Sequence, residues 1–500
     1  MAQLKKILAG TFAVAMAASV LASCGDSSSS SKAADASGAA DTSAAAGTES
    51  KGGNAAASGN IKEPKAERIT QTAEGSADSQ KKLRICTWNE EFKNRLRAYY
   101  DQYDKEKSGM TGETDKDGNF IVGEKEYLKD GTEIEWLTTP NKDNAYQNKL
   151  DTDLAAQAGS DMKIDMFLIE ADYALKYVNG PYVMPIKEVG LTDDDLKEQY
   201  QYTKDIVTDS NGDLEAVSWQ ATPGLFAYRR DIAKDVLGTD DPAEVQAKIS
   251  NWDDFNAVAA QMKEKGYFML SGYDDSYRTF SNNVTKGWVD ADSNVVIDDN
   301  IMKWVDQTKE YTEKGYNNKT ALWSEEWGKD QSKEGKVFGF FYSTWGINFT
   351  LAGNAKSNDL YYVCPGPQAY YWGGTWICAA DGTDNKDIVK DIMYKLTCDK
   401  DNMKKLTQET QDYTNNNAAM KELSEGFQSE FLGGQNHIAL FVDAAAKIDA
   451  SNAGPYDQGC NEEIQTAFHD YFSGKVDKDT ALANFYKAIK VKYPNLKTPS

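Results

Sequence analysis

From Lys81 onward, short apolar runs alternate with segments of helical periodicity, and this alternation constrains the fold more than any other feature. Runs at 83–88, 133–137 and 164–169 have the length of buried strands. Apolar residues at helical spacing follow the first two of these runs. Strands that alternate with helices form βαβ units, so a mainly parallel sheet is expected in an α/β fold.

The rest of the body continues the mixed pattern and becomes mostly helical after residue 386. Further strands are expected at 216–228, 337–342, 361–364 and 376–380, and helices at 252–265 and 301–314. A chain of 500 residues exceeds what one core usually supports, so at least two lobes are expected.

Residues 108–131 are polar and carry Gly turn signals, so we expect a loop or hairpin insertion there. Within it, Asp115 to Asn119 has the acidic spacing of a calcium loop, but Phe120 stands where an EF-hand needs Gly. No metal site is predicted.

The first residues have the features of an export signal. Lys5 and Lys6 precede an apolar stretch at 7–21 that is too short for a confident membrane span. The following Leu-Ala-Ser-Cys, ending at Cys24, resembles a bacterial lipoprotein signal (1–23), which is cut before a lipidated Cys. The alternative is an ordinary cleaved signal with an incidental Cys.

Residues 25–80 are rich in Ser, Ala, Gly and charged side chains and contain no aromatic residue. Such a segment buries too little apolar area to offset its chain entropy. We expect 24–80 to be a disordered tether that holds a folded body off the membrane.

Charge excludes several functions. The net charge of −23 repels phosphate backbones and anionic lipid headgroups, so no nucleic-acid partner is expected. Contact with the membrane then depends on acyl chains at Cys24.

Five cysteines remain after Cys24, an odd number for an exported protein: Cys86, Cys364, Cys378, Cys398 and Cys460. Their spacing is wide and argues against a zinc site. Buried free thiols are expected, although a Cys364–Cys378 bridge stays open.

Enzyme motifs are largely absent from the sequence. No zincin, nucleophile-elbow or P-loop pattern occurs, and only His437 and His469, both in helical stretches, are available for His-based catalysis. We expect no enzyme and no cofactor. Acidic pairs such as Glu90-Glu91 keep a lipid-anchored glycoside hydrolase open as an alternative.

Tryptophans provide the positive signal. Trp88, Trp219, Trp345, Trp372 and Trp376 fall at predicted strand ends or turns, where side chains reach a cleft. An indole face matches the C–H face of a sugar ring, and nearby polar groups bond its hydroxyls.

Between Lys81 and Leu496 the order of motifs resembles the family 1 extracellular solute-binding proteins, the maltose-binding-protein-like receptors of carbohydrate ABC importers. The matching pieces are Ile85–Phe92, Asp165–Glu170, Val217–Asp231, Trp345-Gly346, Gly373–Trp376 and Gly474–Ile489. Ile164, Ser343 and Arg229-Arg230 depart from the family pattern and affect the expected ligand more than the fold.

The resemblance implies a two-lobe, type II-like periplasmic-binding-protein fold with hinge crossings and a helical C-terminal part. The first lobe would be 81–218 plus 366–408, and the second 219–365 plus 409–500. A monomer would capture a carbohydrate and deliver it to an ABC permease outside the cytoplasmic membrane, and the five candidate tryptophans favour an oligosaccharide as that carbohydrate. A surface adhesion lipoprotein without a small ligand remains a further alternative.

The expected ligand-binding residues of the first lobe are Trp88, Asn89, Glu90, Glu170, Asp172, Trp372, Gly374 and Trp376. Those of the second are Trp219, Gln220 and Trp345, with Asp412 near the last crossing. Trp219, Trp345 and Trp376 would stack on sugar rings, and the carboxylates and amides would bond hydroxyls. Glu170 or Asp172 could instead cap the helix that follows.

Overall fold

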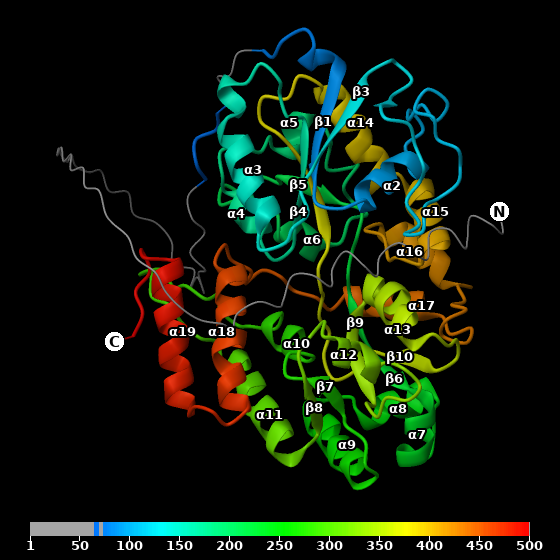
Figure 1. The fold of residues 1–500 in the computed structure, drawn as a ribbon, viewed down its shortest axis with the longest axis vertical. Helices are drawn as coiled ribbons and strands as arrows, with labels where there is room; N and C mark the ends of the chain where they lie inside the picture. The colour runs from blue at the N-terminus through cyan, green and yellow to red at the C-terminus, as the bar shows by residue number, and fades with distance from the viewer. Residues whose placement is uncertain (1–64, 70–73, 500) are drawn as a thin grey trace.

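The computed structural model describes residues 65–69 and 74–499 (Figure 1). The expected signal peptide, Cys24 and the tether as far as residue 64 lie outside the described residues. Within the described ranges, no helix is both long and apolar enough to cross a bilayer.

A six-stranded sheet forms the core of the first lobe, in the order β2-β3-β1-β4-β11-β5. Its strands are β1 (Lys82–Thr87), β2 (Glu126–Tyr127), β3 (Glu133–Thr138), β4 (Met166–Glu170), β5 (Ala216–Ser218) and β11 (Thr375–Ala379). Strand β1 is parallel to β3 and β4, whereas β11 is antiparallel to both β4 and β5.

The expected mainly parallel sheet is therefore correct only for β3, β1 and β4. Strand β11 returns from the second lobe without a crossover helix, so it enters at the edge where β4 ends and runs the other way. The first four residues of β4 are all buried, as expected for a strand covered on both faces.

Helices surround this sheet, as Figure 1 shows. They are α2 (Glu91–Tyr99), α3 (Ala145–Ala155), α4 (Ala174–Val178), α5 (Ile186–Val189), α6 (Gln201–Asp205), α14 (Lys386–Thr397) and α15 (Lys400–Thr410).

The second lobe contains a three-stranded antiparallel sheet, β10-β6-β9, and a small parallel pair, β7 and β8. The strands are β6 (Gly224–Arg229), β7 (Leu270–Gly272), β8 (Asn317–Thr320), β9 (Gly339–Ser343) and β10 (Tyr361–Cys364). Its helices are α7 (Arg230–Leu237), α8 (Pro242–Lys248), α9 (Trp252–Glu264), α10 (Tyr277–Ser281), α11 (Asp299–Lys314), α12 (Glu325–Asp330), α13 (Ala352–Ala355), α18 (Asp457–Phe472) and α19 (Lys478–Lys492).

Two more helices connect the lobes along the C-terminal half of the chain. Helix α16 (Asn417–Ser424) packs against α15, and α17 (His437–Ala445) packs against β6. The residue limits that we expect for each lobe stay a prediction.

Three chain crossings join the lobes and are hydrogen-bonded to one another. The backbone N–H of Ala221 donates to the Tyr413 carbonyl at 3.1 Å, and that of Trp372 donates to the Thr222 carbonyl at 3.0 Å. Three paths of chain, bridged in antiparallel fashion, thus form one connected layer between the lobes, which confirms the expected two-lobe hinged fold.

The last part of the expected tether is not disordered. In residues 65–69, the backbone N–H of Ala66 donates to the Asn179 carbonyl at 2.9 Å, and that of Ile69 to the Pro181 carbonyl at 3.3 Å. We call this segment the strap. It is ordered because it forms backbone hydrogen bonds and ion pairs with the first lobe. The composition of the segment alone could not reveal these contacts.

Two cations of the strap meet buried carboxylates of the first lobe. Lys65 Nζ lies 3.0 Å from Glu215 Oε1, and Arg68 Nη2 lies 2.7 Å from Asp381 Oδ1. Burial raises the pKa of Glu215 to about 7, although Lys65 opposes the shift. The strap therefore supplies charge that the first lobe needs.

The five cysteines are free and buried, which confirms the expected thiols and shows no Cys364–Cys378 bridge in the described chain. Burial raises the pKa of Cys86 and of Cys364 to about 12, so neither is a reactive thiolate. His437 and His469 lie in α17 and α18, as expected.

Candidate binding cleft

A cavity of about 720 Å³ lies between the lobes and is lined from both sides. Its first-lobe wall comes from the carboxyl ends of β1 and β4, where loops leave the sheet and side chains are exposed to a crevice. Nine of the twelve expected site residues line it: Trp88, Asn89, Glu90, Glu170, Asp172, Gln220, Trp345, Trp372 and Gly374.

Three half-buried tryptophans form one wall of the cleft, which we call the tryptophan wall. Trp323 stacks on Trp345 with ring centroids 6.1 Å apart and planes at 22°. Trp372 contacts Trp345 edge-on at 5.5 Å, and its carbonyl accepts a hydrogen bond from Trp345 Nε1 at 3.0 Å. These fixed indoles present apolar faces to the cavity.

Trp323 was missed by the sequence analysis. It directly precedes Ser324, which caps α12 by accepting a hydrogen bond from the Trp327 backbone N–H. The available signal was an aromatic residue in a turn immediately before a capping Ser. Nothing in the sequence pattern distinguished Trp323 from a core residue.

Trp88 forms the aromatic part of the first-lobe wall. It is half-buried, and its ring contacts Tyr146 edge-on with centroids 5.2 Å apart. Tyr146 is buried in the core, and its hydroxyl donates to the Leu168 carbonyl at 2.7 Å. The indole of Trp88 is therefore positioned by a rigid neighbour.

Two glycines shape the loop beneath the tryptophan wall. Gly373 and Gly374 have φ values of +74° and +117°, which L side chains rarely adopt. A Cβ on Gly373 would also lie 3.3 Å from Trp345 Nε1. The loop can pass under Trp345 only because both residues lack side chains.

Asp172 and Glu170 lie at the end of β4, and neither side chain caps α4, whose N-cap is Tyr173. Asp172 forms a two-fold ion pair with Arg278 of α10 in the second lobe. Glu170 Oε2 accepts the Asp172 backbone N–H at 2.9 Å. Burial and the neighbouring Asp172 charge raise the pKa of Glu170 above its usual range.

Asn89 and Glu90 at the start of α2 are also engaged with their own lobe. Asn89 Oδ1 accepts the Glu91 backbone N–H at 3.0 Å. Glu90 bonds Lys93 Nζ at 2.5 Å and Arg97 Nη1 at 3.2 Å. The carboxylate is thus largely compensated where it faces the cavity.

Asp412 does not line the cleft, which corrects its expected role. Its carboxylate is fully buried behind the cleft and accepts hydrogen bonds from Arg95 at 3.2 Å, Gln220 at 3.1 Å and Thr344 at 2.8 Å. A buried carboxylate needs such partners. Asp412 therefore holds the crossings together instead of meeting a ligand.

The same network reaches the cavity through Gln220 and Glu91. Gln220 Nε2 donates to Glu91 Oε1 at 2.8 Å, and Gln220 Oε1 accepts the Thr375 backbone N–H at 3.2 Å. Burial raises the pKa of Glu91 to about 7, although Arg95 opposes the shift. One polar cluster thus connects helix α2, a crossing and the first residue of β11.

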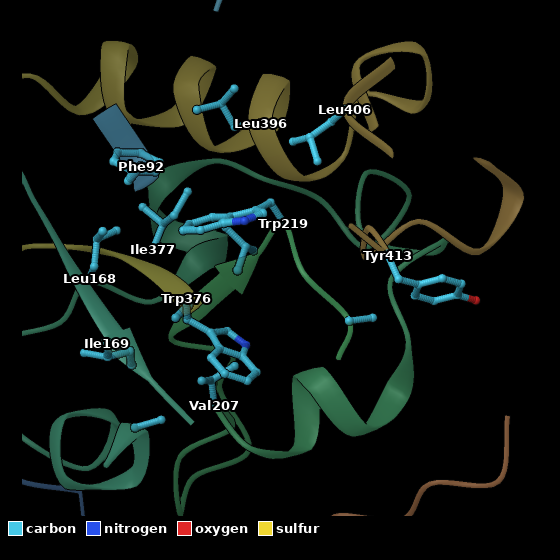
Figure 2. Packing of buried hydrophobic residues seen from close by; sticks show 14 of the residues in the cluster. Phe92, Leu168, Ile169, Val207, Trp219, Trp376, Ile377, Leu396, Leu406 and Tyr413 are labelled. Atoms are coloured by element: carbon cyan, nitrogen blue, oxygen red, sulfur yellow. The ribbon is translucent and has the colours of Figure 1, made fainter. Parts of the chain in front are cut away.

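Trp219 and Trp376 are core residues, and the expectation that they stack on a sugar is wrong. Figure 2 shows both indoles within the apolar cluster. Trp219 stacks on Phe92 at 5.5 Å, and Trp376 Nε1 donates to the Thr203 carbonyl at 2.9 Å. Both residues lie next to cleft residues in the sequence. Successive side chains of an extended chain point to opposite faces, so these two indoles point into the core instead of the cleft.

A hinged pair of α/β lobes with an aromatic and polar cavity between them defines a bilobal ligand-binding protein. The chain belongs to the bacterial extracellular solute-binding protein family, whose sequence profile matches residues 124–431. This match confirms the resemblance seen in the sequence, and the family is one of binding proteins.

Solved structures share the fold. An extracellular solute-binding protein of family 1 has a TM-score of 0.67 at 18% identity, covering 81% of this chain and 99% of its own. A binding protein associated with an ABC transporter from B. animalis subsp. lactis Bl-04, in complex with β-1,6-galactobiose, has a TM-score of 0.59 at 17% identity, covering 84% and 100%.

A third structure is the extracellular solute-binding protein from Staphylococcus aureus in complex with maltose, with a TM-score of 0.55 at 18% identity, covering 83% of this chain and 99% of its own. At these identities the likeness establishes the fold alone. A search of curated protein sequences found no match.

Proposed function

We propose that this protein is the carbohydrate receptor of an ABC importer, which closes its two lobes on a neutral oligosaccharide. It would be anchored outside the cytoplasmic membrane by acyl chains on Cys24 and would deliver its ligand to a permease. The observation that carries the proposal is the tryptophan wall facing polar first-lobe groups across one cavity.

The cleft suits the two kinds of surface that a sugar presents. Trp88, Trp345 and Trp372 offer indole faces to the C–H faces of rings. Glu170 offers a carboxyl group that can hydrogen-bond the hydroxyls of a sugar. A ligand that touches both lobes favours the closed form by its difference in affinity for the two forms.

Charge argues for a neutral ligand. Among the described residues, Lys142 and Arg278 are the two basic residues that line the cavity, and Arg278 is already engaged by Asp172. The acidic side chains that line the cavity outnumber these two cations, which further disfavours an anion. Sugars bearing uronate or phosphate groups are therefore expected to bind poorly.

Hydrolysis is less well supported than binding. A glycoside hydrolase needs two carboxylates with separate roles on either side of the bond. Asp172 is held by Arg278, and Glu90 is held by Lys93 and Arg97. Neither carboxylate is placed to act as a nucleophile or base.

A calorimetric screen of the full chain against neutral oligosaccharides, with maltose and β-1,6-galactobiose included, tests the proposal. We expect saturable binding, an intact ligand afterwards, and at least tenfold weaker binding by Trp88→Ala at an unchanged melting temperature. Turnover would favour the hydrolase, and the absence of binding across the screen would favour the adhesion lipoprotein.

A further inference from the structure

A second cavity, of about 800 Å³, adjoins the cleft on the other side of the tryptophan wall. Residues of α12, α13 and the π-helical turn Gly346–Leu351 line it, and we call it the outer groove. Trp323 and Trp345 line both the outer groove and the cleft. The two cavities therefore meet at one pair of indoles.

The outer groove combines an apolar floor with a polar rim. Trp327 and Phe349 are 3% and 6% exposed and form the floor. The rim consists of Ser324, Ser332, Thr350, Asn354 and Ser357 together with charged side chains of both signs. Apolar floors with polar edges accommodate ligands that have ring faces and hydroxyls.

The charges around the outer groove nearly cancel. Lys329 and Glu325 form an ion pair at 2.6 Å, and Glu334 lies beside Lys333 in sequence at the same rim. Lys356 adds one further positive charge. A surface of this kind attracts neither a strongly acidic nor a strongly basic ligand.

The indole of Trp323 lies between the two cavities and is fixed by its neighbours. Its ring contacts Trp327 edge-on with centroids 5.1 Å apart and stacks on Trp345. Its φ of +68° is unusual for a bulky residue and is retained only when packing determines it. Such strained residues cluster at ligand clamps.

We propose that the outer groove binds the outer sugar units of the same neutral oligosaccharide whose inner units occupy the cleft. This inference rests on the proposed function, and it assigns the ligand to chains longer than the cleft alone holds. The shared indoles carry it, since a glycan that leaves the cleft along Trp345 meets Trp323 and then the groove.

All groove residues come from the second lobe between 323 and 357. The groove therefore keeps its shape whether the lobes are open or closed. The outer units add affinity without depending on closure, whereas the inner units contribute through closure.

Thr350→Trp is the discriminating variant, because Thr350 is half-buried and lines the groove but not the cleft. Calorimetry on the full chain would use maltose to maltohexaose and β-1,6-galactobiose to β-1,6-galactotetraose. In the wild type we expect at least a tenfold gain in affinity from the shortest to the longest binding member of a series. T350W should abolish this gain and keep the shortest ligand within twofold of the wild type.

Thr350→Ala is the matched control, because it leaves the groove open and should retain the gain. Two results would overturn the proposed role of the outer groove and leave the cleft function intact. One is equal affinity of the wild type for short and long ligands, and the other is a gain in affinity with length that T350W retains. If the wild type binds no member of either series, the proposed function fails and the groove fails with it.

Discussion

Asp172 and Arg278 come from opposite lobes and form a bidentate ion pair, with Nη1–Oδ1 at 2.5 Å and Nη2–Oδ2 at 2.6 Å. Their side chains are 33% and 23% exposed, so solvent screens the pair only in part. Parallel N–H···O bonds of this kind fix direction as well as distance. The pair therefore stabilises the arrangement of the lobes seen in this structure, in which the two side chains meet, before any ligand is considered.

Arg278→Gln should shift the ligand-free protein toward the open form. Loss of the pair removes about 1–3 kcal/mol of closed-state stabilisation, between the values for exposed and buried pairs. Small-angle X-ray scattering should show a larger radius of gyration. Arg278→Lys keeps the charge without the fork geometry and should be intermediate, and an unchanged radius in R278Q would show that the pair does not control closure.

Trp345→Ala and Trp376→Ala should separate binding from stability. Trp376 is 2% exposed, so its removal leaves a cavity and lowers the free energy of unfolding by about 3–5 kcal/mol. Trp345 is half-buried in the cleft wall, so its removal should weaken oligosaccharide binding at least tenfold with a smaller loss of stability. Denaturation and calorimetry measure both quantities, and a stable W376A with weakened binding would return Trp376 to the site.

His437 should make the protein less stable at acid pH. It is fully buried between Phe427 and Phe441, and burial lowers its pKa to about 4 although a backbone contact with Gln435 opposes the shift. Between pH 6.5 and 4 the unfolded chain binds a proton that the folded chain excludes, so stability falls as the pH falls.

The size of this effect follows from the shift in pKa. The loss contributed by His437 reaches up to about 3 kcal/mol below pH 4 and is absent above pH 6.5. His437→Leu should remove that contribution, measured as the difference from the wild type in urea denaturation at several pH values. A difference that stays constant from pH 4 to 7 would contradict the prediction.

Lys65→Met should destabilise the first lobe, because it leaves Glu215 buried without its cation. Breaking a buried pair costs about 3 kcal/mol. Burial holds the folded-state pKa of Glu215 at about 7 even beside Lys65, and removal of the cation raises that pKa further, so the penalty should grow as the pH rises above 7 and be smallest below pH 7. Lys187→Met is the control, since its ion pair with Asp213 is largely exposed and should change stability by under about 0.5 kcal/mol.

Cys24→Ala should release the protein from membranes. If Cys24 carries the acyl chains, the variant should lose incorporation of labelled palmitate and should leave the membrane fraction. Equal membrane retention of the variant and the wild type would favour an ordinary signal with an incidental Cys.

Local patterns predicted most elements of the fold, because strands and helices depend on nearby residues. The run at 164–169 became β4, and the periodic segment at 301–314 became part of α11. The antiparallel entry of β11 depends on how the chain returns from the other lobe. No local pattern records that path.

The types of residue in the site could be predicted from the sequence, but which of them line the cleft could not. Strand-end tryptophans such as Trp88 and Trp345 do line the cleft, whereas Trp219 and Trp376 differ from them only in which side of the chain they occupy. Arg278 was missed because its partner lies 106 positions earlier in the sequence. Pairing at that distance depends on how the two lobes are placed relative to each other.

The strap has a mechanical consequence. Apart from neighbours in sequence such as Lys82, residues 65–69 and 75–79 bond to first-lobe segments between residues 161 and 215 and at 381–384, among the contacts of the described chain. A force applied along the upstream chain therefore enters the body through the first lobe. If the chain is anchored to the membrane through Cys24, the first lobe is the fixed one. The second lobe is then the one that moves when the hinge bends.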